Sequence, residues 1–244
     1  MIKRVSALMV CGLLAACSGA ARPPVATLAA LQTCAGGVAR NDAELAPFQR
    51  CALISGDLAV SGVTSLAALS KLHAVRGTLS IVNTELEGLT DLGSVARVGR
   101  LELRSNSHLS SLAGLAHLRH TQEVVLQGNP ELRTLAGLSG LRELDRLSIR
   151  DTSLYSLHGV ENVSNLNALE LVGNPHLIDP RALNRVREVH EVVIRKNPRL
   201  CARFGLLAGL ERAERVSLSQ NVALDRSAVL RLVEARTQAT LALR

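Results

Sequence analysis

The 244-residue sequence contains residues that could bind a metal or act in catalysis, but they are dispersed along the chain. Seven histidines occur, and the closest pair is His117 and His120. This pair lacks the glutamate that a zinc-protease helix places beside its two histidines. The sequence contains neither a G-x-S-x-G nucleophile motif nor a phosphate-binding glycine loop. We therefore interpret the histidines as exposed polar positions, and we expect no metal site, no cofactor and no enzymatic activity.

Charged residues are more regularly arranged than these candidates for chemistry. Arginine and glutamate alternate with apolar residues in segments such as RLELR at 100–104 and RLSIR at 146–150. Alternation with a period of two is typical of a strand with one buried face, so the polar side chains should share the other face. The candidate binding face consists of Arg100, Glu102, Arg104, Glu123, Gln127, Arg146, Arg150, Glu170, Glu191 and Arg195.

Two interpretations of this face are open. Its charges could simply compensate one another, with Glu123 near Arg100 and Arg146, and each exposed pair would then contribute at most about 1 kcal/mol. Alternatively, it is a broad polar docking surface. The chain has no Trp and only Tyr155, Phe48 and Phe204 as aromatic residues, which argues against a tight protein hot spot and against stacking on sugar rings. We favour solvation for a single residue and docking for the face as a whole.

The elements that must position this face recur at a nearly constant interval. Alternating apolar pairs begin at residues 58, 79, 101, 124, 147, 169, 192 and 216, which are 21 to 24 residues apart. Eight short strands at one interval predict a solenoid in which successive coils stack into one parallel sheet. Leu241 and Leu243 predict a ninth strand or a terminal cap.

Each strand is followed by a turn residue, a leucine and a short apolar segment. Asparagine suits the turn because it tolerates unusual backbone angles and bonds to nearby backbone groups. Apolar residues at three-residue intervals, as in SLAGLAHL, predict a short helix or a 3₁₀ turn. The predicted fold class is therefore a β-rich α/β solenoid of about eight coils, with short helical or 3₁₀ segments opposite one sheet. The predicted turn residues are Asn83, Asn106, Asn129, Asp151, Asn174, Asn197 and Asn221.

These repeats resemble two related families. The L-x-L strand with its asparagine and leucine is similar to the leucine-rich repeat. The opening CAGGVARNDAELAPFQRC, the glycines in SGDLAV, RGTLSI and VGRLEL, and the run NTELEGLTDLGSV resemble the receptor L domain. The likeness covers about residues 34–224 and implies a non-catalytic, ligand-binding solenoid. That domain is usually half as long and its ligand contacts lie on variable loops, so no binding residue is transferred.

The N-terminus resembles a bacterial lipoprotein signal. Lys3 and Arg4 precede a short apolar run that ends in LAAC at Cys17. The resemblance implies that residues 1–16 are removed, that Cys17 receives acyl chains that enter a lipid bilayer, and that residues 17–33 form a tether. Ser18 implies delivery to the outer membrane of a bacterial cell envelope. The alternative is an ordinary secretory signal with an incidental cysteine.

The predicted location determines how the remaining cysteines are interpreted. Cys34 and Cys51 would meet an oxidising compartment, where we expect them to pair and to stabilise the fold by about 3 kcal/mol. Cys201 is then left over, either as a small buried hydrophobe, which we favour, or as a reactive thiol. The solenoid domain is expected to span residues 34–244, with a disulfide-closed N-terminal cap at 34–57, repeats at 58–224 and a C-terminal cap at 225–244.

Charge adds little to the choice of partner. The net charge is +7, and it falls to +5 without Lys3 and Arg4, but no aromatic residues are interspersed to stack on bases. We expect no nucleic-acid binding. The predicted function is recognition or adhesion by an envelope lipoprotein, with a protein or glycan of the envelope or of a neighbouring cell as partner. The alternative is a structural scaffold or spacer of the outer membrane.

Overall fold

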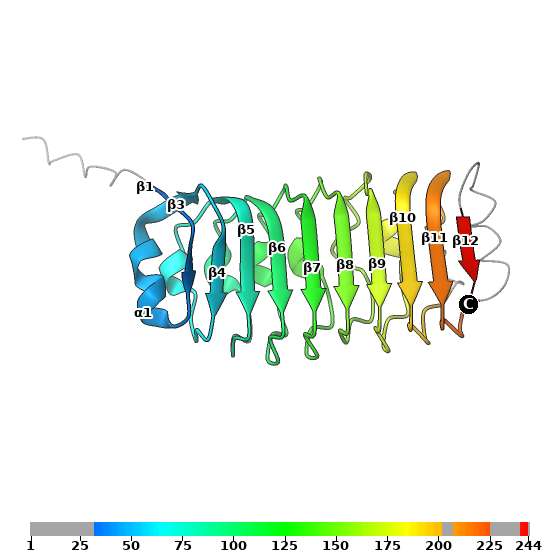
Figure 1. Cartoon of the computed structure of the whole chain (residues 1–244), viewed down its shortest axis with the longest axis horizontal. Coiled ribbons are helices and arrows are strands. Elements are labelled where there is room, and N and C mark those ends of the chain that lie inside the picture. Colours follow the sequence, from blue (N-terminus) through cyan, green and yellow to red (C-terminus); the bar gives the residue numbers. More distant parts are fainter. Residues whose placement is uncertain (1–31, 202–206, 225–239, 244) are drawn as a thin grey trace, which may run out of the picture. The chain divides into compact units, whose positions relative to one another are not determined.

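The computed structural model describes residues 32–201, 207–224 and 240–243, which belong to one compact unit that begins at Leu31. The strands of these residues form one sheet in the order β1-β3-β5-β6-β7-β8-β9-β10-β11-β12, while β2 pairs with β4 and β4 with β5 (Figure 1). All of these pairings are parallel. The predicted β-rich solenoid is therefore confirmed. The strands are β1 (Gln32–Cys34), β2 (Gly37–Ala39), β3 (Cys51–Ile54), β4 (Leu58–Ser61), β5 (Ala74–Val82), β6 (Arg97–Arg104), β7 (Glu123–Gln127), β8 (Arg146–Arg150), β9 (Ala168–Val172), β10 (Glu188–Arg195), β11 (Arg212–Ser219) and β12 (Thr240–Leu243).

Several predicted segments lie outside the described residues. They are the signal peptide at 1–16, Cys17 with the tether as far as residue 31, and residues 225–239 and 244 of the predicted C-terminal cap. Leu241 and Leu243 do form a strand, because β12 pairs in register with Val216 and Leu218 of β11. Within the described residues, no helix has the length and apolar character needed to cross a bilayer.

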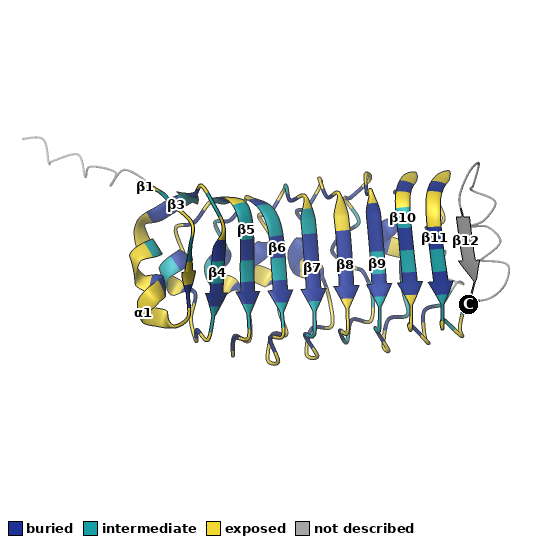
Figure 2. Cartoon of the chain, viewed as in Figure 1, coloured by how far each residue is buried: buried dark blue, intermediate teal, exposed yellow. Residues whose placement is uncertain are grey.

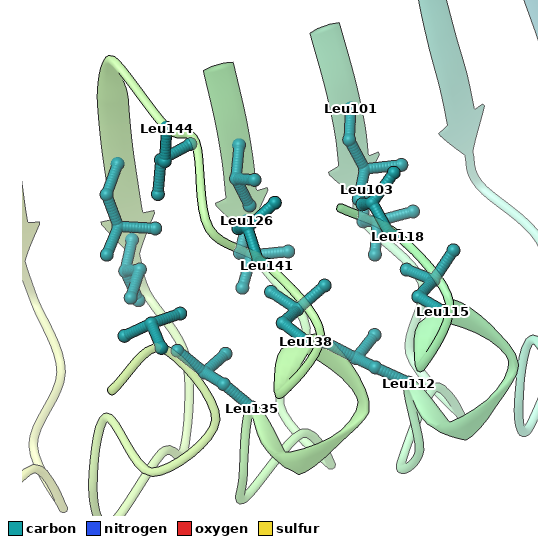
Figure 3. Close-up of a cluster of buried hydrophobic side chains, with 14 of the residues drawn as sticks. Leu101, Leu103, Leu112, Leu115, Leu118, Leu126, Leu135, Leu138, Leu141 and Leu144 are labelled. Atoms are coloured by element: carbon teal, nitrogen blue, oxygen red, sulfur yellow. The ribbon is translucent and has the colours of Figure 1, made fainter. Parts of the chain in front are cut away.

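The core is a set of aliphatic columns that run from coil to coil. Register pairs Leu101 with Val124, Val124 with Leu147, and Leu147 with Leu169, and all four side chains are buried. Opposite the strands, leucines of successive coils such as Leu112 and Leu135 point into the same interior (Figure 3). The inward positions of the central strands are uniformly buried (Figure 2). Each buried leucine contributes about 1.5–3 kcal/mol, but only when neighbouring coils cover it.

Short 3₁₀ helices form the side opposite the sheet, as the three-residue spacing predicts. They are η2 (Ala67–Leu69), η3 (Thr90–Leu92), η4 (Ala113–Leu115), η5 (Ala136–Leu138) and η6 (Arg181–Leu183). The recurring glycine of the LAGL segments allows close stacking here. A Cβ atom on Gly114 would collide with the carbonyl oxygen of Leu89, and one on Gly137 with that of Leu112. Only glycine lets neighbouring backbones approach this closely.

A buried amide ladder holds the turns after the strands. The side-chain oxygen of Asn129 accepts a hydrogen bond from the backbone N–H of Asn106 (3.1 Å), and its amide donates to the carbonyl of Leu103 (2.9 Å). Asn174 and Asn197 repeat this arrangement, and the side chains of all four asparagines are fully buried. The ladder satisfies backbone groups that the bend would otherwise leave unpaired.

Two of the predicted turn residues, Asn83 and Asp151, do lie in turns but are not members of the ladder. Asn83 and Asp151 have φ near +52°, so they occupy the left-handed position that precedes the ladder. The ladder positions themselves are Thr84 and Thr152, whose hydroxyls donate to Asn106 and Asn174 (2.7 Å each). Asparagine is common both at left-handed turn positions and at positions where its amide bonds to the backbone, so residue type alone did not distinguish the two.

The first coil is closed by the Cys34–Cys51 disulfide, which joins β1 to β3 and confirms the predicted pair. Between the two cysteines, α1 (Asp42–Leu45) and η1 (Ala46–Arg50) cover the end of the stack. Asn41 caps α1 by accepting from the N–H of Glu44 (2.9 Å). Cys201 has a free thiol and is half-buried.

Replacing Asn129 by alanine should destabilise the fold by about 3 kcal/mol, because it leaves the buried N–H of Asn106 and the buried carbonyl of Leu103 without a partner. The matched control is Asn83→Ala, which removes an amide outside the ladder and should cost about 1 kcal/mol for its left-handed backbone. Urea denaturation followed by circular dichroism measures both. Equal losses would contradict the position of the ladder.

Candidate functional site

The exposed face of the sheet carries three columns of side chains over β6 to β11. The strands pair without a shift, so equivalent residues lie side by side at the usual spacing of about 4.8 Å. The first column is Arg100, Glu123, Arg146, Ala168, Glu191 and Arg215; the middle column is Glu102, Val125, Ser148, Glu170, Val193 and Ser217; and the third column is Arg104, Gln127, Arg150, Val172, Arg195 and Ser219. All ten predicted face residues therefore lie on this face.

Glu102 is the centre of a polar cluster over β5 to β7. Its carboxylate contacts the guanidinium groups of Arg100 (2.7 Å) and Arg104 (3.2 Å), and it accepts a hydrogen bond from Ser80 (3.3 Å). Arg100 also contacts Glu123 on the next strand (3.1 Å). One glutamate thus orients two arginines, and one of these arginines links two strands.

Glu170 has the same role three strands further along. It accepts hydrogen bonds from Arg150 (2.6 Å) and from the hydroxyl of Ser148 (3.0 Å). On β10, Arg195 donates to the hydroxyl of Ser217 (2.7 Å). In the first column Glu123 lies 3.9 Å from Arg146, and Glu191 lies 3.6 Å from Arg215.

The arginines lie further out than the glutamates they contact. Side-chain exposure is 17% for Glu102 and 26% for Glu170, but 39% for Arg104 and 44% for Arg150. The three columns also contain six arginines against four glutamates. A ligand that approaches this face therefore meets guanidinium groups before carboxylates, and the accessible surface is positively charged.

The middle column is less exposed than the alternating pattern predicts. Val125 and Ser148 are only 5% exposed, although both point away from the core. Strands are closer together than the length of an arginine side chain, so long neighbours cover short ones. The accessible side chains of this face are thus concentrated in the two outer columns.

A hollow lies where the strands begin, away from the three columns. It has a volume of about 650 Å³, and Arg76, Arg97 and Asp145 line it together with His120 and Glu143, which are 2.7 Å apart. Sequence reasoning missed Glu143 as a partner of His120, because it lies on the next coil. The hydroxyl of Thr121, which also borders this hollow, is buried and bonded to backbone carbonyls, so it is not an activated nucleophile.

The other histidines form no metal centre in the described part of the chain. His117 borders a different hollow from His120, together with His73 and Arg119. No group of three His, Cys, Asp or Glu side chains with suitable geometry occurs among the described residues. Elsewhere, hydrogen bonds from Arg181 hold the pKa of Asp179 below its usual value, in a third hollow that His158 and Glu161 also line.

Sequence reasoning also missed a longer repeat. The segment LSIVNTEL at 79–86 returns as LSIRDTSL at 147–154, LELRSNSHL at 101–109 as LELVGNPHL at 169–177, and VVLQGNPEL at 124–132 as VVIRKNPRL at 192–200. Each pair is 68 residues apart, which is three coils. This three-coil period was not recognised from the sequence because the one-coil period dominates the pattern of apolar residues. Ser80 of β5 pairs with Glu102 and extends the middle column by one strand, and the extended column reads Ser-Glu-Val twice, from Ser80 to Val125 and from Ser148 to Val193.

Comparison with known proteins gives no family for this chain. No protein-family model matches it, and no curated protein matches it. Among solved structures, an internalin from Listeria monocytogenes is similar with a TM-score of 0.40 and 16% identity, over 84% of this chain and 72% of that one. A likeness at this level carries no argument about function. The assignment of the fold rests on the sheet, its register and its repeating coils.

Glu102→Gln should destabilise the protein by about 1 kcal/mol at low salt, because Arg100 and Arg104 lose the carboxylate between them. The loss should shrink at high salt, where repulsion between the two arginines is screened. Urea denaturation at two salt concentrations measures it. The control is Glu131→Gln, which removes an exposed glutamate 4.0 Å from Arg133 and should change nothing measurable. A loss that does not depend on salt would contradict the electrostatic origin.

Proposed function

We propose that this chain is a non-catalytic recognition module of a bacterial envelope lipoprotein, and that it binds its partner through the three columns on β6 to β11. The observation that carries this proposal is the layered charge of the face, with arginines outside and glutamates beneath them. Side chains that are held in place by their neighbours lose less entropy on binding. A rigid sheet with oriented guanidinium groups is suited to recognition of a large polar partner.

The proposed anchor is the acylated Cys17. The charged start with Lys3 and Arg4, the short apolar run and LAAC support it. Two or more acyl chains would hold the protein stably at a bilayer. Residues 18–31 would then separate the solenoid, which begins with β1 at Gln32, from the membrane. The partner would be a protein or glycan of the outer membrane or of a neighbouring cell.

A scaffold or spacer is the second candidate function. Two features favour it: the amide ladder and the aliphatic columns make the stack rigid, and several charges of the face are already paired within the chain. A scaffold needs no specific ligand, so the two candidates differ in whether charge reversal on the face abolishes a saturable interaction.

Reversal of two arginines tests the recognition function. We expect the full chain, purified in mild detergent, to bind a component of an envelope extract saturably, and Arg104→Glu with Arg150→Glu to abolish that binding. The control is Arg133→Glu, which changes an exposed arginine outside the three columns. Circular dichroism and thermal unfolding establish that the variants are folded. Equal binding by the wild type and the double variant would favour the scaffold.

Cys17→Ser tests the anchor. The substitution removes the thiol that would accept the acyl chains, so we expect the mature protein to disappear from the membrane fraction and its signal to remain unprocessed or to be cut elsewhere. Cell fractionation and mass spectrometry of the N-terminus measure both effects. Cys11→Ser, within the predicted signal peptide, is the control and should leave processing unchanged. An unmodified N-terminus in the wild type would refute lipidation.

A further inference from the structure

We propose that Arg104, Arg150 and Arg195 form a binding row for one acidic polysaccharide chain that runs along the stack of coils. The inference rests on the recognition function proposed above and specifies the class of ligand. The three arginines occupy the third column on β6, β8 and β10, which are alternate strands of the sheet. We call these three residues the arginine row.

The spacing of the arginine row is regular. Two strand intervals separate its members, which corresponds to about 9.6 Å between the backbones of neighbouring members. Gln127 and Val172 fill the strands between them. In an extended polysaccharide with a two-sugar repeat, every second sugar presents its acidic group to the same side. A row of single charges at a fixed interval is suited to such a polymer.

The arginine row does not follow the three-coil repeat of the rest of the face. The equivalents of Arg104, Arg150 and Arg195, 68 residues away, are Val172, Val82 and Gln127. The middle column, in contrast, keeps Ser-Glu-Val in both copies. Duplication of three coils therefore explains the middle column but not the arginine row, whose period of two strands needs a separate cause. A ligand with its own repeat provides one.

Each arginine of the row is held by one neighbouring side chain, which is a carboxylate for Arg104 and Arg150 and a hydroxyl for Arg195. One terminal nitrogen of the guanidinium group contacts a neighbour: Glu102 for Arg104, Glu170 for Arg150 and Ser217 for Arg195, at 2.6–3.2 Å. A guanidinium group has five N–H donors, so further donors remain for a ligand. The fixed side chains can form charge-assisted hydrogen bonds with carboxylates at little cost in entropy.

The chemistry of the face favours an acidic glycan over a protein. Protein hot spots are rich in Trp and Tyr, and the three columns contain no aromatic residue. The same absence excludes stacking on sugar rings, so a glycan would have to be held through its acidic groups. Valine is the largest apolar side chain among them. Recognition would then depend on charge and hydrogen bonds, and on many weak contacts along one chain. Simultaneous binding at several arginines raises affinity through effective concentration.

The test uses the full chain in mild detergent and oligogalacturonates of increasing length, with calorimetry as the measurement. Oligomers too short to bridge two arginines should bind weakly, and those that span the row should bind about 100-fold more tightly. Arg104→Gln, Arg150→Gln or Arg195→Gln should each remove most of that gain. The matched control is Arg212→Gln, an arginine of the same sheet that lies near Glu188 (3.8 Å) outside the row. It removes the same charge and should keep the gain.

Three outcomes would overturn the inference: no dependence on length, equal loss in Arg212→Gln, or tighter binding of poly-L-glutamate than of an oligogalacturonate of equal charge. Circular dichroism on each variant excludes loss of folding as the cause. A different result is that no acidic polysaccharide binds, while a component of the envelope extract binds the wild type and not the charge-reversal variant. That result would support the recognition function and refute the binding of a polysaccharide by the arginine row. If neither an acidic polysaccharide nor a component of the envelope extract binds, both the recognition function and the role of the arginine row are wrong.

Discussion

Burial of each coil by the next coil is the interaction on which this structure depends. A coil of 21 to 24 residues has too little interior to cover its own leucines, whereas a stack buries Leu101, Val124, Leu147 and Leu169 in one column. The amide ladder adds a polar counterpart, because Asn106 and Asn129 satisfy backbone groups of their neighbours. Stability is thus a property of interfaces between coils, and local sequence contributes by making every interface alike.

The same constraint arranges the candidate binding face. Leucine columns allow only one register, because a shift by one residue would move the whole apolar set to the outer side. Residues between the leucines are therefore held outward in columns at the strand spacing. Charges that are far apart in sequence, such as Arg100 and Glu123, become neighbours for this reason. The core needs no charge on this face, so packing does not determine which polar residues the face carries.

Two periods are superimposed on this face. The Ser-Glu-Val order of the middle column returns after three coils, together with Thr84 and Thr152 in the ladder, and indicates that a block of coils was duplicated. The arginine row repeats every second strand instead. Exposed ion pairs contribute little to stability, so the stack alone does not require either arrangement of charges on the face. The layered charge, with Glu102 and Glu170 beneath arginines, should therefore affect the approach of a charged molecule more than it affects the stability of the fold.

The sequence by itself determined the coil period, the eight strands of the repeats, the 3₁₀ segments and the alternation of core and surface, because each of these depends on residues close together in the chain. It did not predict β1, β2 and β3 within the N-terminal cap. The Cys34–Cys51 pair also followed from it. Only the tertiary structure decided which of two adjacent turn positions is buried, why Val125 is covered, and that His120 lies beside Glu143 on the next coil. These features depend on contacts between residues one coil apart, where an offset of one position reverses the environment of a side chain. Local pattern does not resolve that offset, whereas the stacking of neighbouring coils does.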